Sequence, residues 1–460
     1  MITREMLSED QELALQYMLK FVKSTNRQMI LQGYAGTGKS SLMQIFLSLV
    51  NKSSSLDIIC TAPTNEAVRV ISKLTGEKYS QTIYSLLGLA LVFEDDKEPK
   101  LKTVGTPKIS EYDIVIIDES SMIDRQILSN IEQNLKQFTY VKVIYVGDDA
   151  QLPPIKDVQT GLKCSQVFSL KNKSMLTTVM RTANDNPIIN VVTIIRNNLL
   201  SPEDKFERVT KITGDHGIEF YDSRDKFMED LYADFLSDEY KQDNNYVRAI
   251  AYTNNAVNAM NIAIRKKLFG ADKLPEYVVG ENLIVDEPIT ERINSKVSKI
   301  VYTAGERLRV LDINEYKDVE FGYRTWHLKV VNYEEDSDKQ KKTSITVIHK
   351  EDLDIYQGVL EELATKSKMK MFQQAPDKNG VMRNLYTKAE AWGEYFRFKE
   401  HYSWVKYAYS LTVHKSQGST VRKVYVVERD INRLNWDDEE RNKLKYVAFT
   451  RASHVLNILQ

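Results

Sequence analysis

Eight consecutive residues near the N-terminus have the types and the spacing that a phosphate group requires. They read Gly-Tyr-Ala-Gly-Thr-Gly-Lys-Ser, the pattern GxxxxGK[ST], between a predicted strand and an apolar predicted helix at residues 41–50. Glycines let the backbone curl so that its amides face inward, and the helix N-terminus adds partial positive charge. Lys39 would neutralise the phosphates, and the Ser40 hydroxyl would bind Mg²⁺. The loop predicts a nucleoside triphosphate site made of Gly33, Ala35, Gly36, Thr37, Gly38, Lys39, Ser40 and Ser41.

An acidic pair supplies the second part that hydrolysis of a triphosphate needs. The apolar run Ile114–Ile117 ends in Asp118 and Glu119. Asp118 would hold the metal through its water shell, and Glu119 would orient and deprotonate the attacking water. An apolar run that ends in Asp-Glu is a weak signal by itself. On the same sheet as a phosphate loop, it favours a nucleotide hydrolase.

Composition limits the class of protein. A chain of 460 residues exceeds what one hydrophobic core organises, so two or more domains are expected. The net charge of −1 argues against binding duplex DNA by bulk electrostatics, but a groove of hydroxyls, amides, aromatic faces and a few lysines can still hold a single strand. Two cysteines, no apolar run that could span a bilayer and a charged N-terminus indicate a cytoplasmic protein without a membrane segment.

Short apolar runs alternate with helical stretches along most of the chain. This alternation predicts an α/β fold with parallel sheets in two blocks, divided near residues 174–181. A stretch from about 291 to 402 interrupts the second block; it begins with β-like segments at 306–310, 325–331 and 344–348 and continues as a helical region at 351–399. Residues 88–110 carry two apolar pieces around a charged tip and predict an inserted hairpin. The strands expected in the parallel sheets are 28–32, 56–61, 113–117, 141–146, 247–252, 405–409 and 423–427.

Two longer strings extend the argument beyond hydrolysis. Residues 147–154 read Gly-Asp-Asp-Ala-Gln-Leu-Pro-Pro and resemble motif III of the superfamily 1 helicases, GDxxQLPP. Residues 411–420 match that family's motif V, T-x-H-K-x-Q-G-x-[ST]. By this resemblance Gln151 contacts the γ-phosphate and links the nucleotide to the DNA track, while Gln417 and Gly418 approach the nucleotide. A polar amide just beyond a parallel strand lies in the ligand crevice, which agrees with that role for Gln151.

The resemblance also assigns roles to shorter motifs. Gln11 would read the adenine base, and Arg181 and Arg451, from motifs IV and VI, would approach the γ-phosphate from the second domain. An arginine so placed contributes about 10³ to 10⁵ in rate. Tyr84 departs from the family's T-I-H-S pattern, although its ring could still stack on a base. The predicted DNA-binding residues are Pro63, Thr64, Asn65, Thr82, Tyr84, Asn254, Thr412, His414, Lys415 and Ser416.

The order and spacing of the motifs resemble the B-type branch of superfamily 1, the RecD/Dda-like helicases, and most of all the Dda helicases of T-even-like bacteriophages. The implied fold has two RecA-like P-loop domains, a β-hairpin pin insertion and an SH3-like β-barrel with a helical tower. Phe93 and Leu101 flank the hairpin tip and are candidate wedge residues, although packing of the hairpin's own base explains them equally well. The expected domains are 1–87 with 111–175 (1A, the ATP site), 88–110 (the pin, 1B), 176–290 with 403–460 (2A) and 291–402 (2B with the tower).

The likeness implies an ATP-dependent DNA helicase that uses ATP and Mg²⁺ and opens forks as a monomer, in phage-type replication or recombination within the cytoplasm of an infected bacterium. Movement 5′ to 3′ along single-stranded DNA follows only from the resemblance. The tower would be the place for a replication or single-strand-binding protein partner. Three alternatives remain: a translocase that displaces proteins without processive unwinding, a P-loop switch or clamp-loading ATPase, and a DNA-binding scaffold with a vestigial site. The intact Lys39, Ser40, Asp118 and Glu119 argue against the scaffold.

Overall fold

The structure is a computed structural model of the chain, which folds into two compact units. It describes residues 4–53, 55–75, 81–92, 100–103, 105–158, 160–178, 186–294, 297–333, 340, 342–368, 374–376, 382–384 and 388–460. The first unit consists of Met1–Leu89, Gly105–Gly270 and Tyr409–Gln460, and the second of Ala90–Val104 and Ala271–Ala408.

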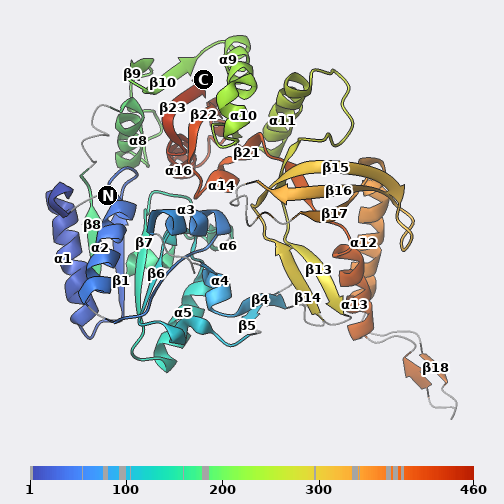
Figure 1. Ribbon diagram of the computed structural model, residues 1–460, viewed down its shortest axis with the longest axis horizontal. Coiled ribbons are helices and arrows are strands. Elements are labelled where there is room, and N and C mark those ends of the chain that lie inside the picture. The colour runs from blue at the N-terminus through green and yellow to red at the C-terminus, as the bar shows by residue number, and fades with distance from the viewer. Residues whose placement is uncertain are drawn as a thin grey trace. The chain divides into compact units, whose positions relative to one another are not determined.

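A parallel sheet in the order β3-β2-β6-β7-β1-β8 forms the first half of the first unit (Figure 1). Strand β6 (Ile114–Ile117) is buried along its length, as expected where helices cover both faces of a parallel sheet. Because β6, β7 and β1 are neighbours, the loops after their carboxyl ends meet at one edge of the sheet. The other elements are β1 (Gln28–Gly33), β2 (Ile58–Ala62), β3 (Gln81–Thr82), β7 (Lys142–Gly147), β8 (Lys173–Leu176), α1 (Glu9–Lys23), α2 (Lys39–Ser53), α3 (Asn65–Thr75), α4 (Ile83–Leu86), α5 (Arg125–Gln137), α6 (Ile155–Val158), η1 (Arg4–Met6), η2 (Lys108–Glu111), η3 (Ser120–Met122) and η4 (Gln166–Ser169).

A second sheet of the same unit has the order β21-β11-β22-β23-β10-β9, and only its edge strand β9 runs antiparallel to its neighbour. We call the first sheet with its helices the first lobe, and this sheet with its helices the second lobe. The elements of the second lobe are β9 (Lys211–Thr213), β10 (His216–Tyr221), β11 (Val247–Ala251), β21 (Ser410–Thr412), β22 (Val421–Val427), β23 (Ala452–Leu459), α8 (Pro187–Asn197), α9 (Arg224–Leu236), α10 (Asp238–Gln242), α11 (Asn254–Phe269), α14 (Val413–Ser416), α15 (Glu428–Ile431) and α16 (Asp438–Phe449).

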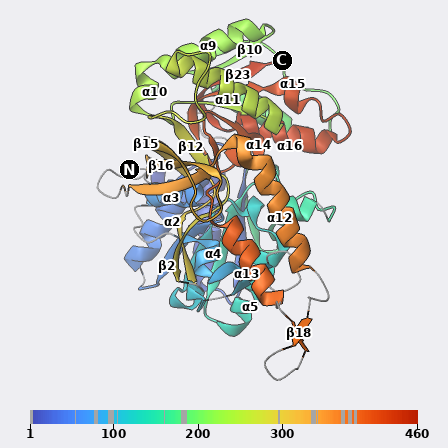
Figure 2. The ribbon, with the colours of Figure 1, turned by 90° about the vertical axis from the view of Figure 1, so that its right-hand side faces the viewer.

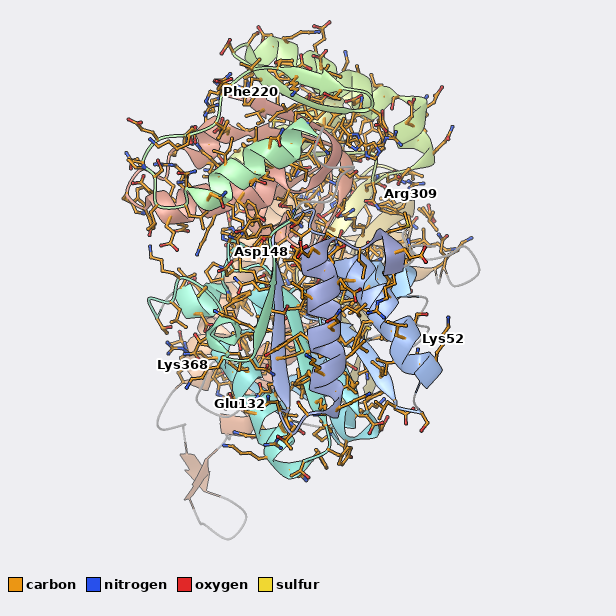
Figure 3. The ribbon with its side chains drawn as sticks, turned by 90° about the vertical axis from the view of Figure 1, so that its left-hand side faces the viewer. Lys52, Glu132, Asp148, Phe220, Arg309 and Lys368 are labelled. Atoms are coloured by element: carbon orange, nitrogen blue, oxygen red, sulfur yellow. The ribbon has the colours of Figure 1, made fainter. Side chains whose placement is uncertain are left out.

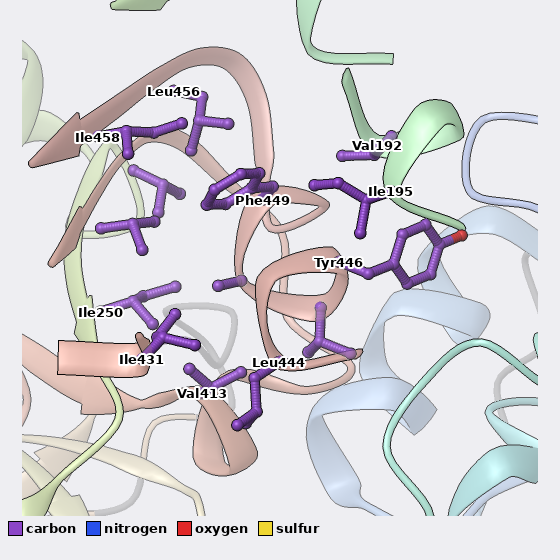
Figure 4. Packing of buried hydrophobic residues seen from close by; sticks show 14 of the residues in the cluster. Val192, Ile195, Ile250, Val413, Ile431, Leu444, Tyr446, Phe449, Leu456 and Ile458 are labelled. Carbon is purple, nitrogen blue, oxygen red and sulfur yellow. The ribbon is translucent and has the colours of Figure 1, made fainter. Parts of the chain in front are cut away.

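The core of the second lobe also includes residues of the first lobe. Its cluster of buried side chains contains Ile250, Leu456 and Phe449 from the second lobe (Figure 4), and it also contains Ala150 and Leu152, which follow β7 of the first lobe. Apolar side chains of both lobes are therefore buried in one cluster when the chain folds. This shared core is part of the contact between the two lobes within the unit.

The second unit is built on an antiparallel sheet in the order β17-β16-β15-β12-β20. Helices α12 and α13 pack side by side (Figure 2), where the rings of Tyr356 and Phe398 stack with centroids 4.8 Å apart. Three further strand pairs belong to this part of the chain. The elements are β12 (Asn282–Val285), β15 (Arg307–Lys317), β16 (Arg324–Asn332), β17 (Thr343–Ile348), β20 (Val405–Tyr407), the pairs β4 (Leu89–Val92) with β5 (Lys100–Thr103), β13 (Ile289–Asn294) with β14 (Val297–Tyr302) and β18 (Gln374–Pro376) with β19 (Met382–Asn384), the helices α12 (Leu353–Ser367) and α13 (Lys388–Lys399), and η5 (Lys350–Asp352).

Two predictions about elements were wrong. The run 405–409 was expected as one strand of a parallel sheet, but β20 pairs antiparallel with β12, and the chain enters the parallel sheet only at β21. Apart from Lys406 the run consists of valine, tyrosine and alanine, which fit either sheet, so its pattern gives no sign of the change of sheet. The region 351–399 is also not helical throughout, because β18 and β19 separate its two helices. The other expected strands are present with ends shifted by a few residues. Within the described ranges, none of the helices has the length and apolar character needed to cross a membrane.

Candidate nucleotide-binding site

The phosphate loop leaves β1 and leads into α2, which begins at Lys39. Gly36 and Gly38 have φ angles of 79° and 73°, a left-handed conformation that glycine adopts without a steric penalty. A Cβ on Gly33 would lie 2.8 Å from the Thr37 hydroxyl, so only glycine fits at that position. The Lys39 ammonium donates to the carbonyls of Gly33 and Tyr34 at 2.8 and 2.9 Å. Its positive charge therefore lies inside the loop, where phosphate oxygens would bind.

The acidic pair follows β6, next to the phosphate loop on the same edge of the sheet. The Glu119 amide donates to the Asp118 carboxylate at 2.9 Å. Loss of water and the neighbouring Glu119 carboxylate raise the pKa of Asp118, whereas the Lys39 ammonium lowers it. Glu119 has a φ of 51° and is the one non-glycine residue with positive φ among the described positions. Such backbone strain is concentrated at functional sites, where the surrounding structure holds the residue in place.

The loop after β7 carries the Gly-Asp-Asp-Ala-Gln-Leu-Pro-Pro string. Asp148 is fully buried and accepts a hydrogen bond from the Ala150 amide at 3.1 Å, and its carbonyl accepts one from the Gln151 amide at 3.2 Å. These bonds fold the loop into a tight turn. Figure 3 labels Asp148 where elements of the two lobes meet. The turn presents the Gln151 side chain to the second lobe.

Gln151 and Gln417 form a hydrogen bond between the lobes. The Gln417 amide nitrogen donates to the Gln151 amide oxygen at 3.1 Å, to the Ser121 hydroxyl at 3.2 Å and to the Leu152 carbonyl at 3.3 Å. Gly418, the next residue, has a φ of 80°, and a Cβ there would lie 3.7 Å from the Thr64 hydroxyl. The structure thus brings together the predicted motif III and motif V residues, and it places motif V close to the loop after β2.

Arg451 lies at the end of α16, 6% exposed, and its guanidinium donates to the carbonyls of Val447 and Ser419 and to the Thr450 hydroxyl, each at 3.0 Å. Burial lowers the pKa of Arg451, and the Glu119 carboxylate is the strongest of the neighbouring groups that oppose this shift. The acidic pair of the first lobe therefore acts on Arg451 electrostatically. Arg181, its predicted partner, lies outside the described residues.

Gln11, the predicted reader of the adenine base, is fully buried in the first turns of α1. Its amide nitrogen donates to the Thr37 carbonyl at 2.8 Å, and its amide oxygen accepts from the Ser8 amide at 3.0 Å, which completes the capping box of the helix. Gln11 is therefore tied to the phosphate loop. Its role toward a base stays a prediction.

The predicted DNA-binding residues of the first lobe lie at or just beyond the carboxyl ends of β2 and of the edge strand β3. Pro63, Thr64 and Asn65 follow β2, and Thr82 and Tyr84 follow or end β3. The Thr82 hydroxyl caps α4 by accepting from the Ser85 amide at 3.3 Å. Burial and the Asp124 carboxylate raise the pKa of Tyr84 to about 12, so its phenol is neutral at physiological pH.

The predicted DNA-binding residues of the second lobe differ in how accessible they are. Asn254, the first residue of α11, and Lys415 are exposed. Thr412 caps α14, and burial lowers the pKa of His414, which keeps the imidazole neutral near pH 7. Ser416 is 1% exposed and donates to the Val413 carbonyl at 2.8 Å, so its hydroxyl is already engaged.

Of the candidate wedge residues of the hairpin, Phe93 lies outside the described part of the chain. Leu101 belongs to β5, which pairs with β4. Among the described residues there is no group of three or more histidine, cysteine or acidic side chains arranged to hold a metal ion. Ser40 and Asp118 offer two hard oxygen donors, and Mg²⁺ in such sites usually completes its shell with waters and substrate phosphates.

Sequence reasoning missed three residues that the structure places at the junction of the lobes. They are Arg196 on α8, Tyr446 on α16 and Asp148 after β7, which share hydrogen bonds. Asp148 lies inside the motif III string, and Tyr446 begins the run Tyr-Val-Ala-Phe-Thr-Arg that ends in the motif VI residue Arg451, so both lie in segments with predicted roles. Arg196 is the one charged residue of the apolar helix Pro187–Asn197. A single charge in an apolar helix was the only feature of the sequence that could have indicated a special role for Arg196.

Comparison with known proteins agrees with this geometry. Residues 6–214 match the family model of an AAA domain, and residues 407–459 match that of a UvrD-like helicase C-terminal domain. The chain is 28% identical to the protein named ATP-dependent DNA helicase dda of Enterobacteria phage T4, over 98% of this chain and 99% of that protein. It is 30% identical to the RecD subunit of the RecBCD enzyme of Buchnera aphidicola, over 38% of this chain and 31% of that protein.

A solved structure shares the fold. It concerns DNA unwinding at forked double-stranded DNA by two coordinating Pif1 helicases, and it matches with a TM-score of 0.51 and 17% identity over 99% of this chain and 92% of that one. Together with the sheet topology, this likeness confirms the predicted fold class at the level of two RecA-like parallel sheets with an antiparallel insertion.

Proposed function

Because this chain belongs to the Pif1/RecD/Dda-like group of superfamily 1B helicases and is an ATP-dependent DNA helicase, we propose that it moves 5′ to 3′ along single-stranded DNA and opens the duplex ahead of it. Its substrates would be single-stranded DNA and forks, and its setting the replication or recombination of a phage in the bacterial cytoplasm. The 5′ to 3′ direction rests on the family alone.

The contact between Gln151 and Gln417 carries this proposal. These two amides join the phosphate-loop lobe to the lobe that holds motif V, at 3.1 Å. A triphosphate bound by Lys39 would lie beside both lobes, so its cleavage would change the contact between them. A pair of lobes that closes and opens in this way can shift a strand that crosses both.

Hydrolysis would use residues of both lobes. Lys39 would hold the β- and γ-phosphates, Glu119 would orient and deprotonate the attacking water, and Arg451 and Arg181 would stabilise the charge that develops on the γ-phosphate. Ser40 and Asp118 offer the hard oxygen ligands that suit Mg²⁺. The charge of a divalent cation there would offset the burial and the Glu119 charge that raise the pKa of Asp118, which is an argument that the residues fit it. Bound Mg²⁺ would neutralise phosphate charge.

The single strand would cross the loops at the carboxyl ends of both sheets. In the first lobe these loops hold Thr64 and Tyr84, and in the second they hold Asn254, His414 and Lys415. Hydroxyl, amide and ammonium groups would bind the backbone, while an aromatic face such as that of Tyr84 would support a base for about 1–3 kcal/mol. Such a track needs no excess of positive charge over the whole protein, which agrees with a net charge of −1.

The remaining elements would serve strand separation. The pair β4–β5 would be the pin, with Phe93 or Leu101 as its wedge. The antiparallel sheet with α12 and α13 would be the SH3-like domain with its tower, and the tower would offer a surface to a replication or single-strand-binding protein. Opening a base-pair step costs about 1.4 kcal/mol on average. A pin therefore needs only to prevent re-annealing while ATP hydrolysis pulls the strand past it.

Duplexes with a single-stranded tail on one side test the activity and the direction together. We expect a duplex with a 5′ tail to be opened in the presence of ATP and Mg²⁺, and a duplex with only a 3′ tail to stay closed. Opening of the 3′-tailed duplex alone would refute the proposed direction. DNA-stimulated ATP turnover and displacement of a bound protein, without opening of either duplex, would favour the translocase instead.

A further inference from the structure

Four side chains connect the phosphate loop to the motif III turn through the second lobe. We infer that Arg196 and Tyr446 are positioning residues that transmit the state of the phosphate loop, at Tyr34 and Ala35, to Asp148 and so to the turn that carries Gln151. This inference rests on the proposed function, since it concerns how the nucleotide site and the DNA track are coupled. We call Tyr34, Arg196, Asp148 and Tyr446 the latch.

Arg196 makes the first connection. Its guanidinium lies over the ring of Tyr34, 3.8 Å from the centroid, so a second-lobe cation rests on a side chain of the phosphate loop. The same guanidinium donates to the Asp148 carboxylate at 3.0 and 3.2 Å and also to Asp149. The Arg196 side chain is 9% exposed and that of Asp148 is fully buried. The ion pair is therefore held in a fixed geometry and is little screened by water.

Tyr446 makes the second connection, through its hydroxyl. The Ala35 amide of the phosphate loop donates to this oxygen at 3.0 Å, and the hydroxyl in turn donates to the Asp148 carboxylate. Figure 4 shows the Tyr446 ring at the edge of the second-lobe core with its oxygen pointing out of the cluster. The ring is fixed by packing, so the position of the hydroxyl follows the position of α16. One hydroxyl thus joins both lobes and both loops.

Asp148 receives both connections and shapes the turn beyond it. Its carboxylate also accepts from the Ala150 amide at 3.1 Å, and its carbonyl accepts from the Gln151 amide at 3.2 Å. Ala150 is packed in the second-lobe core. A shift of the Asp148 carboxylate would therefore change the turn that aims Gln151 at Gln417.

The groups at the other end of the latch are those that a nucleotide engages. Backbone amides of a phosphate loop bind phosphate oxygens, and a nearby guanidinium is attracted to the same negative charge. A phosphate that accepts a hydrogen bond from the Ala35 amide would weaken the bond of that amide to Tyr446. A phosphate that binds Arg196 would likewise weaken the bonds of Arg196 to Asp148. Binding of the triphosphate and the geometry of Gln151 are then linked, and this linkage acts equally in both directions.

The test compares the affinity for a fluorescent oligothymidine with and without a non-hydrolysable ATP analogue and Mg²⁺, measured by anisotropy on the full chain. The ratio of the two dissociation constants is the coupling factor, and couplings between sites are usually about 5- to 150-fold. A coupling factor of one means no coupling. We expect Tyr446→Phe and Arg196→Gln each to bring the factor closer to one by at least about fivefold. Arg196→Lys keeps the charge but not the planar fork, so it should also lose coupling.

Two matched controls stand elsewhere in the second lobe. Tyr425→Phe removes a buried hydroxyl that donates to the Asp234 carboxylate at 2.6 Å, and Arg208→Gln removes a guanidinium that pairs with Glu428 at 2.7 and 2.9 Å. Each control removes the same kind of group as a latch variant, a tyrosine hydroxyl or a guanidinium bound to a carboxylate, at a position away from the phosphate loop. We expect both controls to keep the coupling factor of the wild type within about twofold, because their bonds touch neither lobe junction nor loop.

Each outcome decides the inference. Loss of coupling in the latch variants with retention in the controls supports it. Retention in Tyr446→Phe and Arg196→Lys overturns it, and so does an equal loss in the controls, because the loss would then report a general weakening of the lobe. If the wild type itself neither hydrolyses ATP in response to DNA nor opens a tailed duplex, the proposed function fails, whatever the latch variants do.

Discussion

Gln417 offers the sharpest test of the contact between the lobes. Its amide nitrogen has two hydrogens and faces three acceptors, namely Ser121, Gln151 and Leu152, at 3.2, 3.1 and 3.3 Å. The change to alanine removes this donor, so the three acceptors stay buried but lose their hydrogen bond from Gln417. We expect this one substitution to weaken both the fold and the response of ATP turnover to DNA.

The size of the effect follows from the number of bonds. Two hydrogen bonds at about 0.5–1.5 kcal/mol each correspond to about 1–3 kcal/mol of unfolding free energy. If the contact forms fully only when the lobes close on ATP, the same amount is lost from the transition state, which lowers DNA-stimulated turnover about 5- to 150-fold. The distances exceed the usual 2.9–3.0 Å, so the lower half of that range is the better expectation.

Asn442→Ala is the matched control. The Asn442 amide also donates to several carbonyls, Leu199 and Ser201 at 2.8 Å each, but all its partners lie within the second lobe. Urea unfolding should show a similar loss of stability for Asn442→Ala and Gln417→Ala. Steady-state ATP turnover with and without single-stranded DNA should separate them, because only Gln417→Ala loses the stimulation.

Either of two results would refute this reasoning. Stimulated turnover in Gln417→Ala within about twofold of the wild type would mean that the contact does not differ between open and closed lobes. An equal loss of stimulation in Asn442→Ala would mean that turnover reports the stability of the second lobe and not the contact.

Three further predictions concern single residues. Lys39→Ala should abolish DNA-stimulated ATP turnover and unwinding while anisotropy still reports single-strand binding; turnover at the wild-type rate would argue against this phosphate site. Glu119→Gln keeps the size of the side chain but cannot accept a proton, so kcat should fall by at least about 10²-fold with a much smaller change in KM; rapid-quench measurements would reveal an unaffected chemical step if Glu119 is not the base. Burial lowers the pKa of His414 from its usual 6.5, so the unfolded chain takes up a proton before the native protein does, and stability falls as pH drops below about 6.5. In His414→Gln this part of the pH dependence should be missing from urea unfolding between pH 7.5 and 5.5, and equal slopes for the two proteins would contradict it.

The phosphate loop and the acidic pair could be predicted because their information is local. A glycine-rich string between a strand and a helix, and an apolar run that ends in Asp118 and Glu119, each combine a short pattern with the element that must carry it. Parallel strands bring their carboxyl ends to one edge, so nearness of the two motifs follows from the fold class. The two RecA-like sheets were predictable for the same reason, since buried parallel strands read as short apolar runs.

Sheet membership was not predictable for the run at 405–409. Apart from Lys406 its residues are of types that fit either sheet, and the break between β20 and β21 is set by their partner strands, which come from residues 282–285 and 247–251. Pairing partners so far apart in sequence leave no mark on the run itself.

The sequence alone thus determined which chemical groups the candidate nucleotide site offers and which strands they follow. Only the tertiary structure decided which groups touch across the lobes: Tyr446 meets Asp148 from 298 residues away, and Arg196 meets the ring of Tyr34. The reason is that a buried contact depends on the packing of two helices against a loop, and the pattern of an apolar helix fixes which face is buried but not what lies opposite its one arginine.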